Sequence, residues 1–136
     1  MKKINVNFID NCSHGYYSVS KKDIIKSGVD INEISGFSGL TLNRVYLEED
    51  CDAALFFNKC KENNIEVVVN RTYNPKFDKR HNYTPKLFNF VPRVGMKLFV
   101  GKQEYFITSI SDNYIVINNT HKLSTSNPFK YITDYE

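Results

Sequence analysis

The chain has no apolar run of about 18 residues or more, the length that a membrane-spanning helix needs. Its first residues, Met1 to Asn5, lead into alternating polar and apolar residues and not into the apolar segment of a signal peptide. Its three cysteines, Cys12, Cys51 and Cys60, are an odd number without close pairing, which suits a reducing compartment better than a disulfide framework. We therefore expect a cytoplasmic protein without a membrane partner.

Tryptophan is absent, and the 136 residues include only six glycines and four prolines. The apolar fraction is nevertheless 41%, with ten Phe and nine Tyr, which is enough to build a core and excludes disorder of the whole chain. A chain of this length makes one ordinary domain or two very small ones. Two such modules would have to support each other, because a domain of about 60 residues is only marginally stable alone.

Metal-binding and catalytic motifs are also lacking. Zinc sites usually show Cys-x-x-Cys or paired His spacings, and neither is present. Cys12 and His14, with His81 or His121, remain candidates for a ligand set or for a thiol and its base, and spacing alone neither supports nor excludes this. The simpler interpretation is a turn at His14 whose side chain bonds to the backbone. We expect no cofactor and no enzymatic activity.

An acidic run at Glu48 to Asp52 offers carboxylates, the ligands that hard cations prefer. It lacks the alternating ligand spacing and the glycine of a calcium loop. Acidic residues are also favoured at the start of a helix by capping and by the helix dipole. The structural role is therefore the stronger interpretation.

Residues 1–71 show the patterns of a small α+β domain. Alternating or β-rich runs predict strands at 3–9, 16–19, 44–47 and 65–69. Ser20 and Asp23 have the spacing of a helix N-terminus, and Gly28 would end that helix. A second helix, capped by Asp50 or Asp52, is predicted over 53–63, where one apolar stripe runs along the sequence. We predict an α/β sandwich with the helices on one face of a sheet.

Residues 72–92 differ in composition and predict a long connecting arm, because no helical or strand period persists there. The net charge over residues 71–103 is +7, within a chain of net charge +3. Cations alternate with aromatic rings, the combination that neutralises phosphates and stacks on bases, or that anchors a protein partner. The alternative is a linker whose rings only fasten two modules together. The predicted partner-binding residues are Arg71, Tyr73, Lys76, Lys79, Arg80, Tyr83 and Lys86.

Residues 93–136 contain closely spaced β-rich runs, which predict a sheet built from hairpins. The predicted strands are 96–100, 104–110, 114–117 and a less regular fourth run at 130–132. The segment from Val94 to Ile110, VGMKLFVGKQEYFITSI, resembles the opening of small SH3-like barrels. This resemblance implies a small β-barrel for residues 93–136.

The N-terminal half carries a second resemblance, in His14-Gly15-Tyr16, in the segment 34–38 and above all in the run VYLEEDCDA at 45–53. These residues resemble a family of uncharacterised small proteins of bacteriophages and mobile elements. The resemblance implies a phage or plasmid gene acting in the cytoplasm of a host bacterium, and it implies no chemistry.

Three functional hypotheses follow from these observations. In the first, which we favour, the chain is a phage- or plasmid-encoded, anti-CRISPR-like inhibitor that binds a protein or ribonucleoprotein nuclease effector stoichiometrically. In the second, it binds nucleic acid directly through the basic arm and the barrel, as an accessory protein. In the third, it is a small enzyme that uses Cys12 and His14 or the carboxylates at 48–52.

Overall fold

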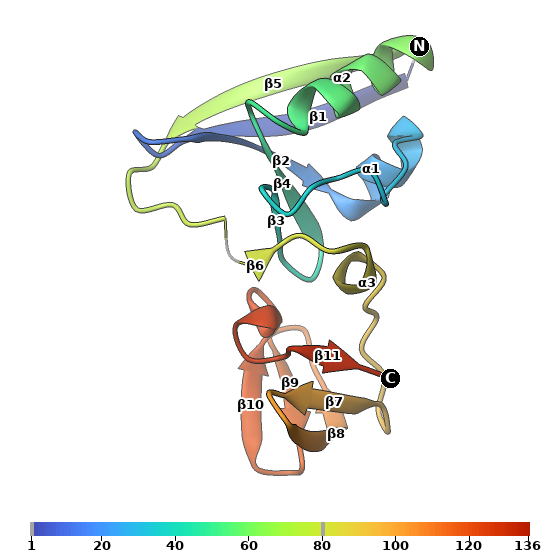
Figure 1. The fold of residues 1–136 in the computed structure, drawn as a ribbon, viewed down its shortest axis with the longest axis vertical. Helices are drawn as coiled ribbons and strands as arrows, with labels where there is room; N and C mark the ends of the chain where they lie inside the picture. Colours follow the sequence, from blue (N-terminus) through green and yellow to red (C-terminus); the bar gives the residue numbers. More distant parts are fainter. Residues whose placement is uncertain (1, 80) are drawn as a thin grey trace.

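The computed structural model describes residues 2–79 and 81–136 and shows a mixed α+β, strand-rich protein with two open sheets (Figure 1). The N-terminal sheet has six strands in the order β5-β1-β2-β4-β3-β6, and the C-terminal sheet has five in the order β10-β9-β8-β7-β11. The predicted α+β class is therefore confirmed. The elements are β1 (Lys2–Asp10), β2 (Gly15–Ser20), α1 (Lys21–Ser27), β3 (Gly39–Leu40), β4 (Arg44–Glu48), α2 (Ala53–Glu62), β5 (Ile65–Tyr73), β6 (His81–Asn82), α3 (Pro85–Phe88), β7 (Lys97–Val100), β8 (Gln103–Ile110), β9 (Tyr114–Ile117), β10 (His121–Ser124) and β11 (Asp134–Tyr135).

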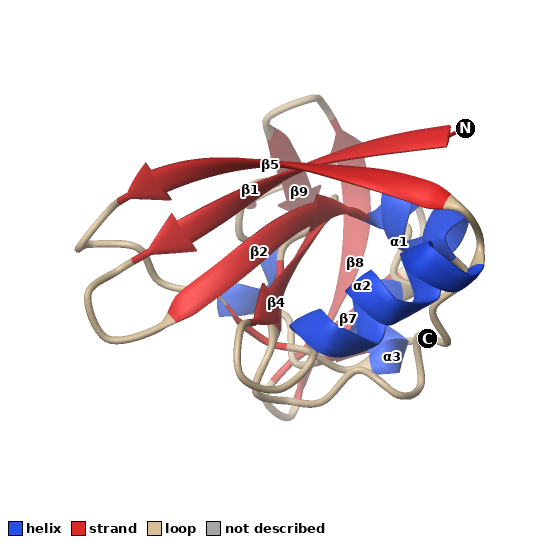
Figure 2. Ribbon diagram, turned by 90° about the horizontal axis from the view of Figure 1, so that it is seen from above, coloured by secondary structure: helices blue, strands red, loops and turns tan. Residues whose placement is uncertain are grey.

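The N-terminal sheet is built around β1, which pairs antiparallel with β2 and parallel with β5. Ile4, Val6 and Phe8 alternate with polar residues and are buried on one face, because successive side chains of a strand point to opposite faces. The helices α1 and α2 contact each other and the strands β2, β4 and β5 (Figure 2). The alternation in the sequence therefore determines which face of this sheet joins the core.

The two N-terminal helices begin and end close to where the sequence predicts. The Ser20 hydroxyl accepts a hydrogen bond from the backbone N–H of Asp23 at 3.1 Å, and Gly28 ends α1 in the left-handed region at φ +84°. In α2, Phe56 and Cys60 are buried one turn apart. Asp52 stands at the N-cap of α2 but makes no capping hydrogen bond, so that part of the prediction is wrong.

The C-terminal sheet confirms three of the four predicted strands as β7, β8 and β9. The predicted strand at 130–132 is wrong, because Pro128–Lys130 form a 3₁₀ turn that places Ile132 in the core. The sequence analysis also missed β10 and β11, which have only four and two residues. Strands this short are specified by their partners in the sheet more than by a pattern of their own.

The predicted arm has more structure than its composition indicated. Strand β5 extends through Tyr73, and β6 adds an edge strand to the N-terminal sheet. Helix α3 begins at Pro85, where the Thr84 hydroxyl accepts a hydrogen bond from the backbone N–H of Leu87 at 3.1 Å. A helix of four residues is too short to show a period, so the capping residues were its only signal.

The arm joins the two sheets through one continuous core. Phe88 and Phe90 are buried, and the Phe90 ring lies 5.6 Å from the ring of Phe129 in the C-terminal part. Lys21, at the start of α1, donates a hydrogen bond from its Nζ to the carbonyl of Phe88 at 3.1 Å. Figure 1 shows α3 between α1 and the C-terminal sheet. No helix within 2–79 and 81–136 is long and apolar enough to cross a membrane.

Candidate partner-binding surface and pocket

The loop at residues 35–38 is held firmly by one buried carboxylate. Asp52 accepts hydrogen bonds from the backbone N–H of Ser35 at 3.1 Å, from the Ser35 hydroxyl at 2.8 Å and from the Ser38 hydroxyl at 2.5 Å. The Ser38 oxygen also accepts from the backbone N–H of Glu48 at 3.0 Å. Charge-assisted bonds to a buried acceptor are the strong class, so this loop is rigid. It nevertheless presents the ring of Phe37 to solvent, with 67% of its surface exposed.

Lys79 is hydrogen-bonded to the backbone of this loop. Its Nζ donates to the carbonyl oxygens of Gly36 and Phe37 at 3.1 and 3.0 Å. The backbones of Lys79 and Gly39 approach so closely that a Cβ at position 39 would lie 2.1 Å from the Lys79 carbonyl oxygen. Only glycine permits this approach. The sequence analysis predicted Lys79 as a site residue but missed Phe37, which had no signal beyond its place between glycines and serines.

Three further predicted residues lie at the end of β5 and in the loop that follows it. The Arg71 guanidinium is 5.0 Å from the centre of the Phe8 ring, Tyr73 is 64% exposed, and Lys76 is exposed. The loop is fastened to the outer face of the sheet by Phe77, whose ring lies 5.1 Å from that of Tyr46. We call Phe37, Tyr73, Lys76 and Lys79 the basic aromatic strip. Arg80, which was predicted as part of this surface, lies outside the described residues.

Two other predicted residues have partners within the fold, and of these Tyr83 is buried and leaves the contact surface, whereas the Lys86 side chain stays 57% exposed. Tyr83 is 2% exposed, and its hydroxyl donates to the carbonyl of Ile31 at 2.7 Å. Burial raises the pKa of Tyr83 above its usual value. The Lys86 ammonium lies 2.5 Å from the carboxylate of Asp134 and 5.1 Å from the centre of the Tyr135 ring. The hydrogen bond to Asp134 raises the pKa of Lys86. Both side chains serve the junction between the sheets.

The candidate catalytic groups only partly converge. A polar cleft of about 340 Å³ is lined by Cys12, His14 and Arg71 together with carboxylates of the β1–β2 turn and the acidic run. The His14 Nδ1 is 3.9 Å from the Glu48 carboxylate. His81 lies elsewhere, 6.3 Å from the ring of Phe129. Within the part of the chain that the structure describes, no group of three His, Cys, Asp or Glu is arranged to hold a metal ion.

The acidic run has structural roles at its two buried members. Asp52 holds the 35–38 loop, and the Glu48 carboxylate accepts from the backbone N–H of Asp50 at 2.8 Å. The hydrogen bond to Glu48 also raises the pKa of the Cys51 thiol. This supports the structural interpretation of the run over the cation-binding one.

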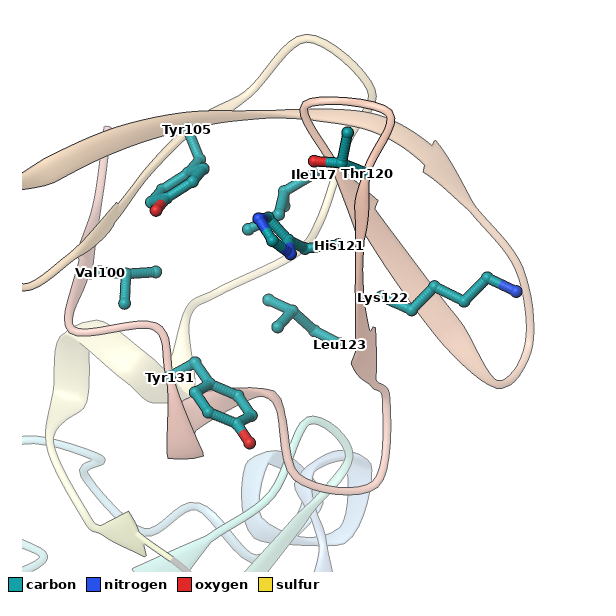
Figure 3. Close-up of a pocket in the computed structure, with 8 residues that line it drawn as sticks. All are labelled: Val100, Tyr105, Ile117, Thr120, His121, Lys122, Leu123 and Tyr131. Carbon is teal, nitrogen blue, oxygen red and sulfur yellow. The ribbon is translucent and has the colours of Figure 1, made fainter.

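A pocket of about 550 Å³ lies in the C-terminal sheet and was missed by the sequence analysis (Figure 3). Its apolar part is formed by Val100, Ile117 and Leu123, from β7, β9 and β10. We call this apolar part the floor of the pocket. Figure 3 shows three aromatic side chains around it, from Tyr105, His121 and Tyr131. The Tyr105 and His121 rings are nearly perpendicular, with their centres 6.3 Å apart. The remaining lining residues are Thr120 and Lys122.

The pocket could not be predicted because its residues come from four strands and from the two turns that hold Thr120 and Tyr131, which meet only in the folded sheet. His121 and Leu123 belong to β10, the strand that the sequence did not reveal. Tyr131 follows the 3₁₀ turn that was predicted as strand.

Comparison with known proteins adds no relative. The chain matches no protein-family model, no curated protein and no solved structure.

Proposed function

We propose that this chain is a non-enzymatic inhibitor of a bacterial defence system, encoded by a phage or plasmid and acting in the host cytoplasm. It binds a nuclease effector, a protein or ribonucleoprotein complex, stoichiometrically and blocks access or movement. The observation that carries the proposal is the rigid presentation of Phe37 beside Lys79 in the basic aromatic strip. An exposed ring on a loop that is already ordered makes a good interface anchor, because little conformational entropy is lost on binding.

The charge of the strip indicates the character of the partner surface. Tyr73 ends β5 and Lys76 lies in the loop that follows it, a segment in which cations outnumber acids. Such a surface complements carboxylates or phosphates, and a ribonucleoprotein effector offers both. The strip is therefore suited to compete for a nucleic-acid-bearing face and not to imitate nucleic acid itself.

The architecture that supports this surface is part of the proposal. We propose that α1, α2 and the N-terminal sheet form a two-layer α/β sandwich, which anchors the strip. We propose that the C-terminal sheet is an SH3-like barrel, because its strand order and the 3₁₀ turn before its last strand agree with that fold. The two modules form one structural unit, because the buried arm packs into a single core with both of them.

The test is affinity capture from bacterial lysate with the tagged chain, with and without nuclease treatment, followed by mass spectrometry. We expect one defence effector that is retained after nuclease treatment, and an equimolar complex with that effector by calorimetry. The variant Phe37→Ala should lose this complex. Ile25→Ala is the matched control, because Ile25 is 66% exposed on α1, outside the strip. The proposal would be contradicted if Phe37→Ala and Ile25→Ala both lost the complex with the effector, or if both retained it.

A second candidate function is direct binding of nucleic acid through the same strip. Tyr73, which is 64% exposed at the end of β5 and lies between Arg71 and Lys76 in the sequence, favours it, since aromatic rings stack on bases. In that case capture would be lost on nuclease treatment. The affinity of the purified chain for a labelled oligonucleotide would also fall steeply with salt, because counterions are released on binding.

A further inference from the structure

We infer that the pocket of the C-terminal sheet is a binding site for one base of a single-stranded nucleic acid. The pocket has the size and the apolar floor of a ligand site, and it is separate from the basic aromatic strip. The inference goes beyond the proposed inhibitor function, which does not depend on this pocket.

The walls of the pocket are suited to a flat ring. Tyr105, His121 and Tyr131 line it, and Tyr131 is 48% exposed, so its ring is accessible from solvent. A nucleobase has two π faces that stack on such rings and a polar edge that hydrogen-bonds. The Thr120 hydroxyl and the His121 imidazole are the polar groups on the lining that can meet that edge (Figure 3).

The charge around the pocket favours a polyanion over a peptide. The lining includes no carboxylate among the described residues. The Lys130 ammonium lies 5.5 Å from the centre of the Tyr131 ring at the pocket, whereas the Lys122 side chain points away from the pocket, with its ammonium over Tyr114 (Figure 3). In the part of the chain that the structure describes, neither ammonium forms an ion pair with a carboxylate. Cations beside stacking rings are the combination that holds the backbone of a single strand while its base is bound.

The chain offers a closely matched control for the pocket ring. Tyr114 is 46% exposed on β9, and the Lys122 ammonium lies 5.4 Å from its ring centre, nearly the arrangement of Lys130 over Tyr131. Tyr114 does not line the pocket, because it alternates with the inward-facing Ile115. The two tyrosines differ mainly in their access to the pocket.

The experiment measures binding of a short fluorescein-labelled oligothymidylate by anisotropy, over a range of salt concentrations. We expect Tyr131→Ala to weaken binding by roughly 5- to 100-fold, from the usual contribution of one stacked base. Tyr131→Phe, which keeps the ring, and Tyr114→Ala should both stay within about twofold of the parent chain. Lys130→Gln should reduce the slope of log affinity against log salt by about one. Circular dichroism verifies that each variant is folded.

Several results would overturn the inference. Equal affinity of Tyr131→Ala and Tyr114→Ala would show that the pocket does not hold a base. A second measurement, an amide NMR titration, should show shifts at residues 120–123 and at Tyr131 with the oligonucleotide. Shifts there with a proline-rich peptide and not with the oligonucleotide would make the pocket a peptide site. The inhibitor proposal is tested by effector capture with Phe37→Ala and not by oligonucleotide binding at the pocket, so the two tests fail or succeed independently.

Discussion

Lys21 is placed where a change of pH should reveal how the two sheets are joined. Its Nζ donates to the carbonyls of Leu87 and Phe88, and it lies 5.3 and 5.8 Å from the ring centres of Phe88 and Phe129. Burial lowers the pKa of Lys21 from 10.5 to about 8. The charged form of this lysine is therefore disfavoured in the folded chain.

The size and sign of the effect follow from this pKa. Lowering the pKa from 10.5 to about 8 corresponds to roughly 3 kcal/mol against the charged form, and partial contact with solvent reduces this to about 2 kcal/mol. Below pH 8 both the folded and the unfolded chain hold the proton, so the penalty is fully present. Between pH 8 and 10.5 the unfolded chain keeps the proton and the folded chain releases it. The free energy of unfolding therefore rises with pH across this window.

The perturbation is Lys21→Met, assayed by urea unfolding at several pH values from 7 to 10 with far-ultraviolet circular dichroism. The other titrating groups contribute equally to the pH dependence of the free energy of unfolding in both chains, so their contributions cancel when the parent is compared with the variant. We expect the parent to gain about 2 kcal/mol over the variant as the pH rises. The difference in free energy of unfolding between parent and variant at pH 7 alone is less informative, because the variant also leaves two carbonyls without a donor. Lys22→Met, at the exposed neighbour, is the control. If the free energy of unfolding changed with pH in the same way in Lys21→Met and in the parent, the buried junction would be refuted.

Three other substitutions test separate parts of the fold. Gly39→Ala should destabilise the chain by about 3 kcal/mol or more in urea unfolding, because its Cβ would collide with the backbone of Lys79. An unchanged midpoint would show that β3 and β6 do not pair. Ser20→Ala should cost about 1 kcal/mol by removing the acceptor at the start of α1, and a loss near zero would contradict that cap. Lys86→Met should leave the unfolding midpoint unchanged, because its pair with Asp134 is exposed and screened by solvent. A clear loss of stability would assign Lys86 a larger structural role.

The sequence predicted those parts of the fold that are determined locally. The alternation in β1 predicted a strand buried on one face, and the spacing of Ser20 and Gly28 predicted both ends of α1. In contrast, β10 and β11 are two short strands that exist because a neighbour offers hydrogen bonds. Their positions depend on contacts across the sheet, which a single sequence does not display.

The candidate surface was predicted less well than the fold, for a related reason. Composition identified the cations of the arm but could not tell which rings were exposed. Tyr73 is exposed and Tyr83 is buried, although both stand among similar neighbours in the sequence. The difference arises from contacts distant along the chain, such as the hydrogen bond from Tyr83 to the carbonyl of Ile31. Phe37 was missed because its exposure depends on the hydrogen bonds to Asp52.

The same contacts that bury the middle of the arm connect the two proposed sites. The backbone N–H of Tyr83 donates to the carbonyl of Ser38 at 2.9 Å, next to Phe37, and the Tyr83 ring lies 6.2 Å from that of Phe88. Lys21 also contacts the rings of Phe88 and Phe129, and Phe129 belongs to the 3₁₀ turn that precedes Tyr131. The strip and the pocket are thus held by one packed junction. A ribonucleoprotein that contacts both would bind more tightly than through either site alone, because the second contact forms within the same complex.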